Sequence, residues 1–320
     1  GALLPGSVAR TDLISPEQTE PLARALYRSV RENLFSLPDD IVVYPTHGTG
    51  TTFCAAAPGG PRATTTIGEE RASNPLFAAP DEDAFVEQLI AGYGSYPSYF
   101  SRLRAVNQRG PRLYGEHPPV LETLSVTKVR EMMEHGAEVI DARPIGQFAA
   151  GHIPGSLSNE LRPAFATWLG WLVPDQRPLI FVLNDDQDRA DVVRQSLKIG
   201  YENIAGELSG GMAAWRQASF EEDLITLVSP RDLRRDLGQI IDVRQMSEFA
   251  QSHIASALTV ELGSLGQATP ALSAGPITVM CGHGERAMTA ASLLARSGRS
   301  DLSVLLGGPD DVPKAMLAWA

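Results

Sequence analysis

The chain of 320 residues is 43% hydrophobic and 20% charged, and it carries a formal net charge of −11. These proportions are ordinary for a soluble globular protein, and the length suggests roughly two or three domains. The acidic balance argues against general nucleic-acid binding, and no apolar run is long enough to span a membrane. Two cysteines cannot form a disulfide framework, so a cytoplasmic protein is expected.

Residues 1–115 differ in character from the rest of the chain. The sequence opens at Gly1 inside "GALL", a predicted strand, so we expect that residues upstream are missing or have been removed. The glycine-rich stretch "VVYPTHGTGTTFC" follows and contains His47 and Cys54. After "TTTIGEERASNPLF" and a proline- and aromatic-rich segment, "GEHPPVLETL" at 115–124 predicts a linker.

The other two thirds of the chain contain an internal duplication. "EVIDARPIGQFAAGHIPGSL" at 138–157 matches "QIIDVRQMSEFAQSHIASAL" at 239–258 at a constant offset. A repeat of about a hundred residues is too long for a solenoid unit and suits a duplicated domain. We therefore expect a first domain at 1–115, a first copy at 123–223 and a second copy at 224–320.

Within each copy, short β-branched runs alternate with amphipathic helical patterns. "EVIDAR" and "LIFVL" predict strands, whereas "RADVVRQSLKIG" and "RAMTAASLLARSG" predict helices ended by glycine. "SVTKVREMM" and "SPRDL" predict capped helices that open the two copies. The alternation predicts an α/β fold with a central parallel sheet, whose functional groups follow the carboxyl ends of the strands.

Cys281 stands where a predicted strand ends and a predicted helix begins. Gly282 and Gly284 allow the loop to curl so that its backbone N–H groups point inward. The amino end of the helix adds positive partial charge, which stabilises a thiolate and any anion held above it. A buried structural cysteine is the competing interpretation, but this setting favours a nucleophile.

The first copy has no cysteine in the corresponding loop. Counting five residues back from Arg189, as from Arg286, places Asn184 at the position of Cys281. An amide cannot replace a thiolate nucleophile. The loop also carries three aspartates, Asp185, Asp186 and Asp188. Their charges would repel an anion, and they lack the glycine and distal glutamate of a calcium loop, so we expect a catalytically inactive copy.

The "DVR…EF…HI" segment, the Cys-x-x-x-x-Arg loop and the late Gly-Gly followed by Trp resemble tandem rhodanese domains. The resemblance implies a sulfurtransferase, in which Cys281 takes the outer sulfur of thiosulfate or a persulfide and passes it on. It also implies that Arg286 closes the loop and helps to hold the anion, and that Asp242, Arg244 and His253 support the fold. The substrate-binding loop would be Gly282, His283, Gly284 and Glu285.

In the first domain, "PTHGTG" followed by "TIGEERASNP" resembles the C-terminal half of a metallo-β-lactamase-fold αββα domain of the persulfide dioxygenase branch. Fusion of such a domain to rhodanese domains is a known architecture. The resemblance implies that His47 binds a mononuclear iron that oxidises a glutathione persulfide, or a similar persulfide, to sulfite with O₂. Cys54 lies near the active-site cysteine region of that family and is a weaker candidate.

The family's His-x-His-x-Asp-His motif is absent from the 320 residues, and its ligand aspartate should fall near Gly1. One histidine cannot complete an iron site. We therefore expect no stoichiometric metal on residues 1–320, and iron only where the natural protein carries the motif upstream.

Two other functions stay open. Rhodanese folds can also host a thiol-based phosphatase or arsenate reductase, although the four residues between Cys281 and Arg286 favour sulfur over the larger phosphate. A non-catalytic scaffold or sensor built from decayed domains is the other alternative. The expected partners are small sulfur compounds (thiosulfate, glutathione persulfide or another low-molecular-weight persulfide), with neither nucleic acid nor membrane, and a homo-oligomer is compatible with the sequence.

Overall fold

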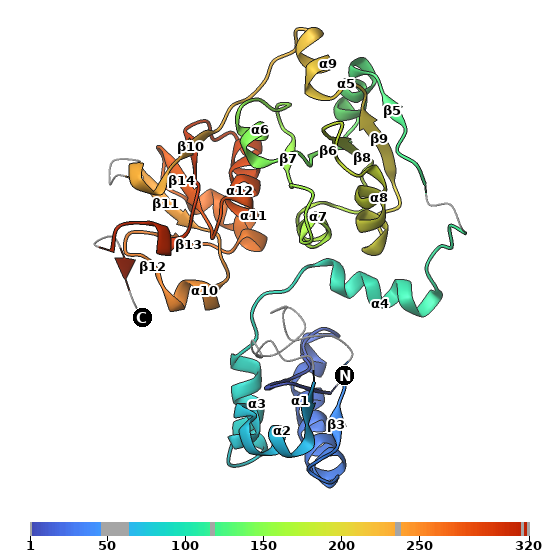
Figure 1. Cartoon of the computed structure of the whole chain (residues 1–320), viewed down its shortest axis with the longest axis vertical. Helices are drawn as coiled ribbons and strands as arrows, with labels where there is room; N and C mark the ends of the chain where they lie inside the picture. Colours follow the sequence, from blue (N-terminus) through green and yellow to red (C-terminus); the bar gives the residue numbers. More distant parts are fainter. Residues whose placement is uncertain (1, 46–63, 116–118, 234–237, 315–316, 319–320) are drawn as a thin grey trace. The chain divides into compact units, whose positions relative to one another are not determined.

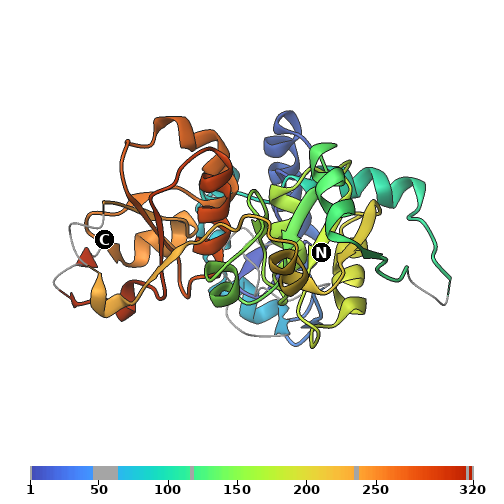
Figure 2. The same ribbon diagram turned by 90° about the horizontal axis from the view of Figure 1, so that it is seen from above.

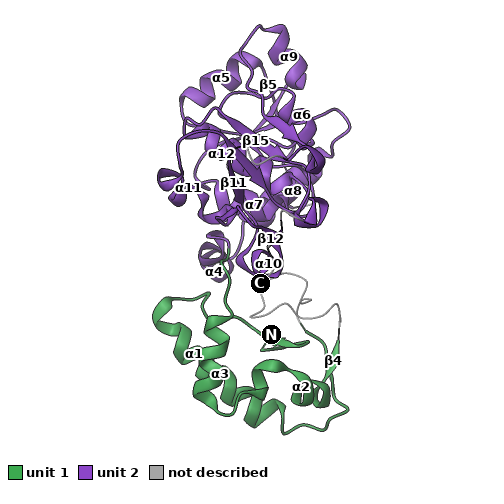
Figure 3. Cartoon of the chain, turned by 90° about the vertical axis from the view of Figure 1, so that its left-hand side faces the viewer, with its two compact units in different colours: residues 1–96 green, residues 97–320 purple. Residues whose placement is uncertain are grey.

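The structure is a computed structural model that describes residues 2–45, 64–115, 119–233, 238–314 and 317–318. The chain divides into two compact units, Gly1–Tyr96 and Pro97–Ala320 (Figure 3). The domain limits expected from the sequence stay predictions. Among the described residues, each helix is too short or too polar to span a lipid bilayer.

The first unit consists of short strands and helices around one apolar core. Its elements are β1 (Leu3–Leu4), β2 (Ser7–Val8), α1 (Pro16–Ser29), the π-helical turn η1 (Val30–Leu34), β3 (Val42–Val43), β4 (Thr65–Thr66), α2 (Ile67–Ser73), η2 (Pro75–Ala78) and α3 (Glu82–Ala91). The strands form two antiparallel pairs, β1–β2 and β3–β4. The strand expected in "GALL" is confirmed as β1, and the core is centred on the stacked rings of Phe77 and Phe85.

The second unit begins with α4 (Tyr99–Arg109) and continues into the first copy. The elements of that copy are β5 (Thr123–Leu124), α5 (Val126–Glu134), β6 (Glu138–Asp141), α6 (Ile145–Ala149), β7 (Leu157–Ser158), α7 (Phe165–Leu172), β8 (Leu179–Val182), α8 (Arg189–Lys198), β9 (Ile204–Leu208) and α9 (Gly211–Gln217). The five strands form one parallel sheet in the order β5-β9-β8-β6-β7. Figure 1 shows this sheet with helices on both sides.

The second copy repeats this plan. Its elements are β10 (Thr226–Val228), η3 (Pro230–Asp232), β11 (Gln239–Asp242), α10 (Met246–Gln251), β12 (His253–Ile254), β13 (Leu258–Thr259), η4 (Leu262–Ser264), α11 (Leu265–Ala268), η5 (Thr269–Ala271), β14 (Ile277–Met280), α12 (Glu285–Arg296), β15 (Leu302–Leu305), η6 (Pro309–Asp311) and β16 (Leu317–Ala318). Five strands form a parallel sheet in the order β10-β15-β14-β11-β13, and β12 pairs with β16 separately. Since the strand order equals that of the first copy, the predicted duplication and parallel sheets are confirmed.

The helix starts of the two copies differ. Ser125 caps α5 as predicted, because its hydroxyl accepts a hydrogen bond from the Lys128 N–H at 3.2 Å. In the second copy, Ser229 caps only the 3₁₀ turn η3 through the Arg231 N–H at 3.3 Å. The capped helix predicted from "SPRDL" is therefore present over Pro230–Asp232, but as a short 3₁₀ helix and not as an α-helix.

Helix α4 was not expected from its aromatic and proline-rich sequence. Arg102 donates to the Ile199 carbonyl at 2.7 Å, and its guanidinium lies 4.9 Å from the centre of the Tyr201 ring. A Cβ atom on Gly170 would collide with the Tyr99 ring. These contacts explain why α4 belongs to the same compact unit as the two copies.

A buried ion pair closes the end of a central strand in each copy. Asp141 pairs with Arg143 at 2.6 Å, and Asp242 pairs with Arg244 at 2.8 Å. Both arginines also donate to a backbone carbonyl eight residues further along the chain. A buried pair of this kind fixes the turn after the strand, since removal of either partner would leave an uncompensated charge. The predicted structural role of Asp242 and Arg244 is confirmed.

The histidine of each copy has the same supporting role. Nδ1 of His152 donates to the Phe148 carbonyl at 2.9 Å, and Nδ1 of His253 donates to the Phe249 carbonyl at 3.0 Å. Each ring stacks on that phenylalanine. Burial lowers the pKa of His152 below its ordinary value, which favours the neutral ring. The structural interpretation of His253 is confirmed.

Candidate functional site

Cys281 directly follows β14, at the carboxyl end of a central strand, and α12 begins four residues later. Figure 1 labels both elements. Its side chain is 1% exposed and belongs to an apolar core cluster. The Gly284 N–H donates a hydrogen bond to Cys281 Sγ at 3.1 Å. Because Gly284 is the N-cap of α12, the sulfur lies at the positive end of that helix.

Glycine is required at two points around this loop. Gly284 has φ +113°, a left-handed conformation that side chains disfavour. A Cβ atom there would also lie 2.9 Å from Cδ1 of Ile145. On the other side, a Cβ atom on Gly308 would lie 3.1 Å from the Gly282 carbonyl oxygen. The "GG" after β15 therefore lets the chain approach the cysteine loop closely.

Arg286 is held by a partner that the sequence reasoning missed. Its guanidinium donates two hydrogen bonds to Glu248 in α10, at 2.7 and 2.8 Å. Burial alone would raise the pKa of Glu248, but the hydrogen bonds and charge of Arg286 outweigh burial and lower it. A comparison of the two copies could have pointed to Glu248, because the first copy has the uncharged Gln147 at the corresponding position.

The predicted loop residues gather around Cys281 in different ways. Gly284 donates to the sulfur, and Gly282 lies near Arg286, since a Cβ atom on it would be 3.8 Å from Nη2. His283 is exposed and Glu285 is half-buried as the first residue of α12. The roles assigned to these residues in binding and catalysis stay predictions.

Sheet register corrects the position that was matched to Cys281 in the first copy. Asp141 pairs with Val182 in the first sheet, and Asp242 pairs with Met280 in the second. Leu183, which follows Val182, therefore occupies the place of Cys281, and the assignment of Asn184 to that place was wrong. The error arose because the loop before Arg189 is one residue longer than the loop before Arg286. A buried leucine, like an amide, cannot act as a nucleophile.

The loop of the first copy is filled by its own side chains. Gln187 accepts from the Asn184 N–H at 2.9 Å and donates to the Ala142 carbonyl at 2.7 Å. Arg189 donates to the carbonyls of Asn184 and Gln187 and pairs with Glu207 in β9 at 3.0 Å. In this loop the backbone carbonyls of Asn184 and Gln187 face the Arg189 guanidinium. Carbonyl oxygens carry negative partial charge, so the loop disfavours a bound anion.

The aspartates of that loop have separate positions. Asp188 caps α8, because its carboxylate accepts from the Asp191 N–H at 3.1 Å. Asp185, Asp186 and Asp188 are all exposed. The three carboxylates of the loop therefore face solvent, and one of them also caps a helix.

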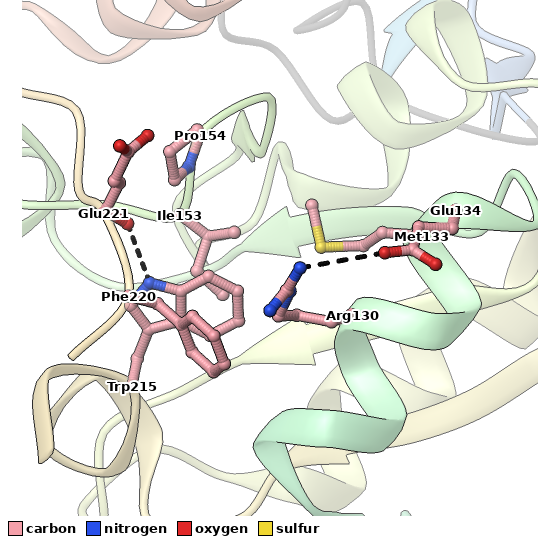
Figure 4. Close-up of a pocket in the computed structure, with 8 residues that line it drawn as sticks. All are labelled: Arg130, Met133, Glu134, Ile153, Pro154, Trp215, Phe220 and Glu221. Atoms are coloured by element: carbon pink, nitrogen blue, oxygen red, sulfur yellow. Dashed lines mark hydrogen bonds and ion pairs between the residues drawn. The ribbon is translucent and has the colours of Figure 1, made fainter. Parts of the chain in front are cut away.

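The first copy also contains a pocket of about 300 Å³ between α5, α9 and the segment after His152 (Figure 4). The Arg130 guanidinium lies 4.4 Å from the centre of the Phe220 ring and 3.7 Å from the Glu134 carboxylate. Trp215 Nε1 donates to the Glu221 carbonyl at 2.9 Å. These polar groups pair with one another, and the pocket does not include the loop after β8.

His47 and Cys54 lie outside the described residues. Within the part of the chain that the structure describes, no three His, Cys, Asp or Glu side chains gather in a way that could hold a metal ion. The described residues therefore do not fit an iron site, and the expectation about metal is untested.

A family model described as "Rhodanese-like domain" matches residues 125–218 and 229–312, which together exceed half of the chain. The chain therefore belongs to the rhodanese-like domain family, with two such domains in tandem. Among curated proteins, it is 32% identical over 79 residues to "Thiosulfate sulfurtransferase GlpE" of Pseudomonas aeruginosa strains LESB58 and UCBPP-PA14, covering 24% of this chain and 72% of that protein.

Among solved structures, the chain is similar to a metallo-β-lactamase from Staphylococcus aureus subsp. aureus COL, with 25% identity and a TM-score of 0.53. The match covers 64% of this chain and 56% of that structure, so the chain spans little more than half of its length. The predicted fusion of a metallo-β-lactamase-like region with two rhodanese-like domains is confirmed.

Proposed function

We propose that this protein is a sulfurtransferase that carries sulfane sulfur on Cys281. One observation carries the proposal: Cys281 Sγ accepts a hydrogen bond from the N-cap of α12 at the carboxyl end of a central parallel strand. Membership of the rhodanese-like family and the similarity to a thiosulfate sulfurtransferase support it.

Sulfur transfer by this loop needs no external oxidant. The Cys281 thiolate attacks the outer sulfur of thiosulfate, the sulfur–sulfur bond of thiosulfate breaks, and sulfite leaves with the bonding electron pair. Cys281 then carries a persulfide. In the second half, an acceptor thiolate attacks the outer sulfur and the Cys281 thiolate leaves. The Gly284 N–H and the helix terminus favour the negative sulfur in both steps.

Arg286 serves this reaction mainly by bracing the loop. Nη1 and Nη2 of Arg286 each donate to the Glu248 carboxylate. These two bonds fix the guanidinium beside Gly282, so it is not free to follow an anion. Its positive charge still faces the loop and favours a bound anion. The four residues between Cys281 and Arg286 argue against a phosphatase, which needs a wider loop. The scaffold alternative predicts that Cys281 carries no sulfur.

A second, finer proposal concerns the metallo-β-lactamase-like region. We propose that, in a protein that supplies further ligands beside His47, this region is an iron-dependent dioxygenase that acts on persulfides of low-molecular-weight thiols such as glutathione. The fold similarity supports it. The described residues do not form a metal site, so we derive no step through iron. Elemental analysis of residues 1–320 purified without chelators should find well under one iron or zinc per chain, and one iron per chain would contradict that expectation.

The decisive experiment is thiosulfate:cyanide sulfur transfer with wild-type protein and with Cys281→Ser. We expect the variant to fall to background while its circular dichroism spectrum stays that of the folded wild type, and Cys54→Ser to keep the wild-type rate. After thiosulfate treatment, mass spectrometry should find one added sulfur on the Cys281 peptide and none on the Cys54 peptide. A Cys281→Ser variant that keeps most of the rate would refute the proposal.

A further inference from the structure

We infer that the first copy, though inactive itself, positions the cysteine loop of the second copy through helix α12, and that Ile145 is a positioning residue for sulfur transfer. The inference rests on the function proposed above. It depends on contacts at three points along α12, the helix whose N-cap donates to Cys281.

The first contact lies at the amino end of α12. A Cβ atom built on Gly284 would lie only 2.9 Å from Cδ1 of Ile145, a residue in α6 of the first copy. The isoleucine side chain therefore lies against the N-cap of α12. Phe148 and Ala149 of the same short helix belong to the core cluster that contains Cys281. The first copy thus supplies apolar side chains to the surroundings of the reactive sulfur.

The second contact lies in the middle of the helix. The backbone N–H of Ser158, in β7 of the first copy, donates to Oγ of Ser292 in α12 at 3.1 Å, and both residues are buried. Ser292 in turn donates to the Thr289 carbonyl at 2.7 Å. Figures 1 and 2 both show α12 (red-orange) beside the first copy. A shift of α12 along β7 would break this bond and leave the buried Ser158 N–H without a partner. The bond therefore fixes the position of α12 relative to β7.

The third contact lies at the carboxyl end of α12. Arg296 donates from Nε to the Gly155 carbonyl at 2.8 Å and pairs with Glu138 at 2.9 Å. Glu138 is buried at the start of β6 and also pairs with Arg177. A cation in the last turn also complements the helix dipole. Fixed at both ends and in the middle, α12 cannot shift without breaking contacts to the first copy.

The contacts along α12 affect sulfur transfer through the backbone nitrogen of Gly284. The Gly284 N–H donates to Cys281 Sγ, and its direction depends on the left-handed backbone of Gly284. Ile145 blocks movement of that residue toward the first copy. Without it, the N–H can turn away from the sulfur. Small misplacements of this kind cost up to roughly 100-fold in rate.

The duplication supplies a matched control. Met246 is the counterpart of Ile145 in the second copy, and the two backbones are anchored alike: the Ile145 N–H donates to Glu160 and the Met246 N–H to Glu261. The side chains differ in their surroundings, because Ile145 packs against the core cluster around Cys281 whereas Met246 is 55% exposed. Truncation should therefore matter at the first position and not at the second.

The test compares Ile145→Ala, Ile145→Val, Ile145→Leu and Met246→Ala in steady-state sulfur transfer from thiosulfate. We expect kcat of Ile145→Ala to fall about tenfold, by misplacement of the N–H, with KM for thiosulfate changed less than kcat. Ile145→Val, which removes only Cδ1, should give an intermediate loss, Ile145→Leu should restore most of the rate, and Met246→Ala should equal wild type. A kcat for Ile145→Ala within twofold of wild type, or an equal loss in Met246→Ala, would overturn the inference.

A second measurement separates this inference from the proposed function. Alkylation of Cys281 by iodoacetamide is followed at one neutral pH, and it needs no sulfur transfer. The rate constant should fall in Ile145→Ala and stay at the wild-type value in Met246→Ala, because the Gly284 N–H that donates to the sulfur is misplaced only in the first variant. If the wild-type protein forms no persulfide but this difference is present, the positioning role stands and the sulfurtransferase proposal fails. Identical rate constants in all variants would remove the positioning role.

Discussion

The loops after β8 and β14 begin at equivalent places in two sheets of the same strand order, yet they are closed in different ways. In the first, Gln187 and Arg189 reach into the loop, and the arginine collects backbone carbonyls. In the second, Arg286 pairs with Glu248, and the Gly284 N–H donates to the sulfur. The first copy therefore differs from the second over the whole loop, and not only in lacking a cysteine.

Apart from loss of the cysteine itself, the largest loss in the active loop is expected from Gly284→Ala. The substitution places a side chain at φ +113° and against Ile145. Backbone strain of about 1–3 kcal/mol corresponds to roughly a five- to 150-fold loss in sulfur transfer if the loop moves to relieve it. Gly266→Ala, in α11, is the control, because a Cβ atom there would meet no atom within 4 Å. Equal activity of the two variants would show that the N-cap geometry is unimportant.

Glu248→Gln makes the second copy resemble the first at this position, where Gln147 stands. We expect sulfur transfer to fall about five- to tenfold, because Arg286 loses a charged partner, with the cost reduced by partial exposure of the pair. Gln147→Glu, the reverse exchange in the first copy, should leave activity unchanged. If Glu248→Gln is as active as wild type, the ion pair does not brace the loop.

The same ion pair sets an acid limit. The pKa of Glu248 in the folded protein lies below the ordinary glutamate value, so the pair contributes stability above that ordinary value and loses it as pH falls through the lowered pKa. Thermal unfolding of wild type and Glu248→Gln should therefore differ at neutral pH and converge in acid. A difference that stays constant down to pH 3 would contradict this sign.

The smallest effect is expected from restoring a thiol to the first copy. Leu183→Cys, in a Cys281→Ser background, should show no sulfur transfer above background, and Asn184→Cys should behave alike. The loop there presents carbonyls and the Arg189 side chain where the second copy presents an N–H. Clear turnover from either variant would show that the missing cysteine alone inactivates the copy.

Local patterns in the sequence predicted much of this architecture. Short apolar runs predicted the strands, and glycines predicted the ends of α8 and α12. The position of Cys281 followed from the junction between a predicted strand and a predicted helix. These features depend on neighbouring residues, whose preferences are visible in one short window. The role of the Asp242–Arg244 pair was accessible for the same reason, since its members are two residues apart.

Features that depend on distant residues were not predictable in this way. Glu248 lies 38 residues from Arg286, and Ile145 much further from Gly284, so no local window contains either contact. Leu183 was missed because counting from Arg189 assumes loops of equal length, which only the pairing of β6 with β8 could test. Helix α4 was missed because its contacts to the first copy, and not its composition, hold it in place.

The helix α12 has a consequence for how the two copies unfold. Its buried bond between Ser292 and Ser158 and its ion pair with Glu138 both join the copies, and the core around Cys281 includes Phe148 of the first copy. Melting either copy removes partner surface from the other, so the two unfolding free energies are coupled and not additive. The pair should therefore melt as one cooperative unit, and a substitution that only destabilises the first copy will lower the temperature at which sulfur transfer is lost.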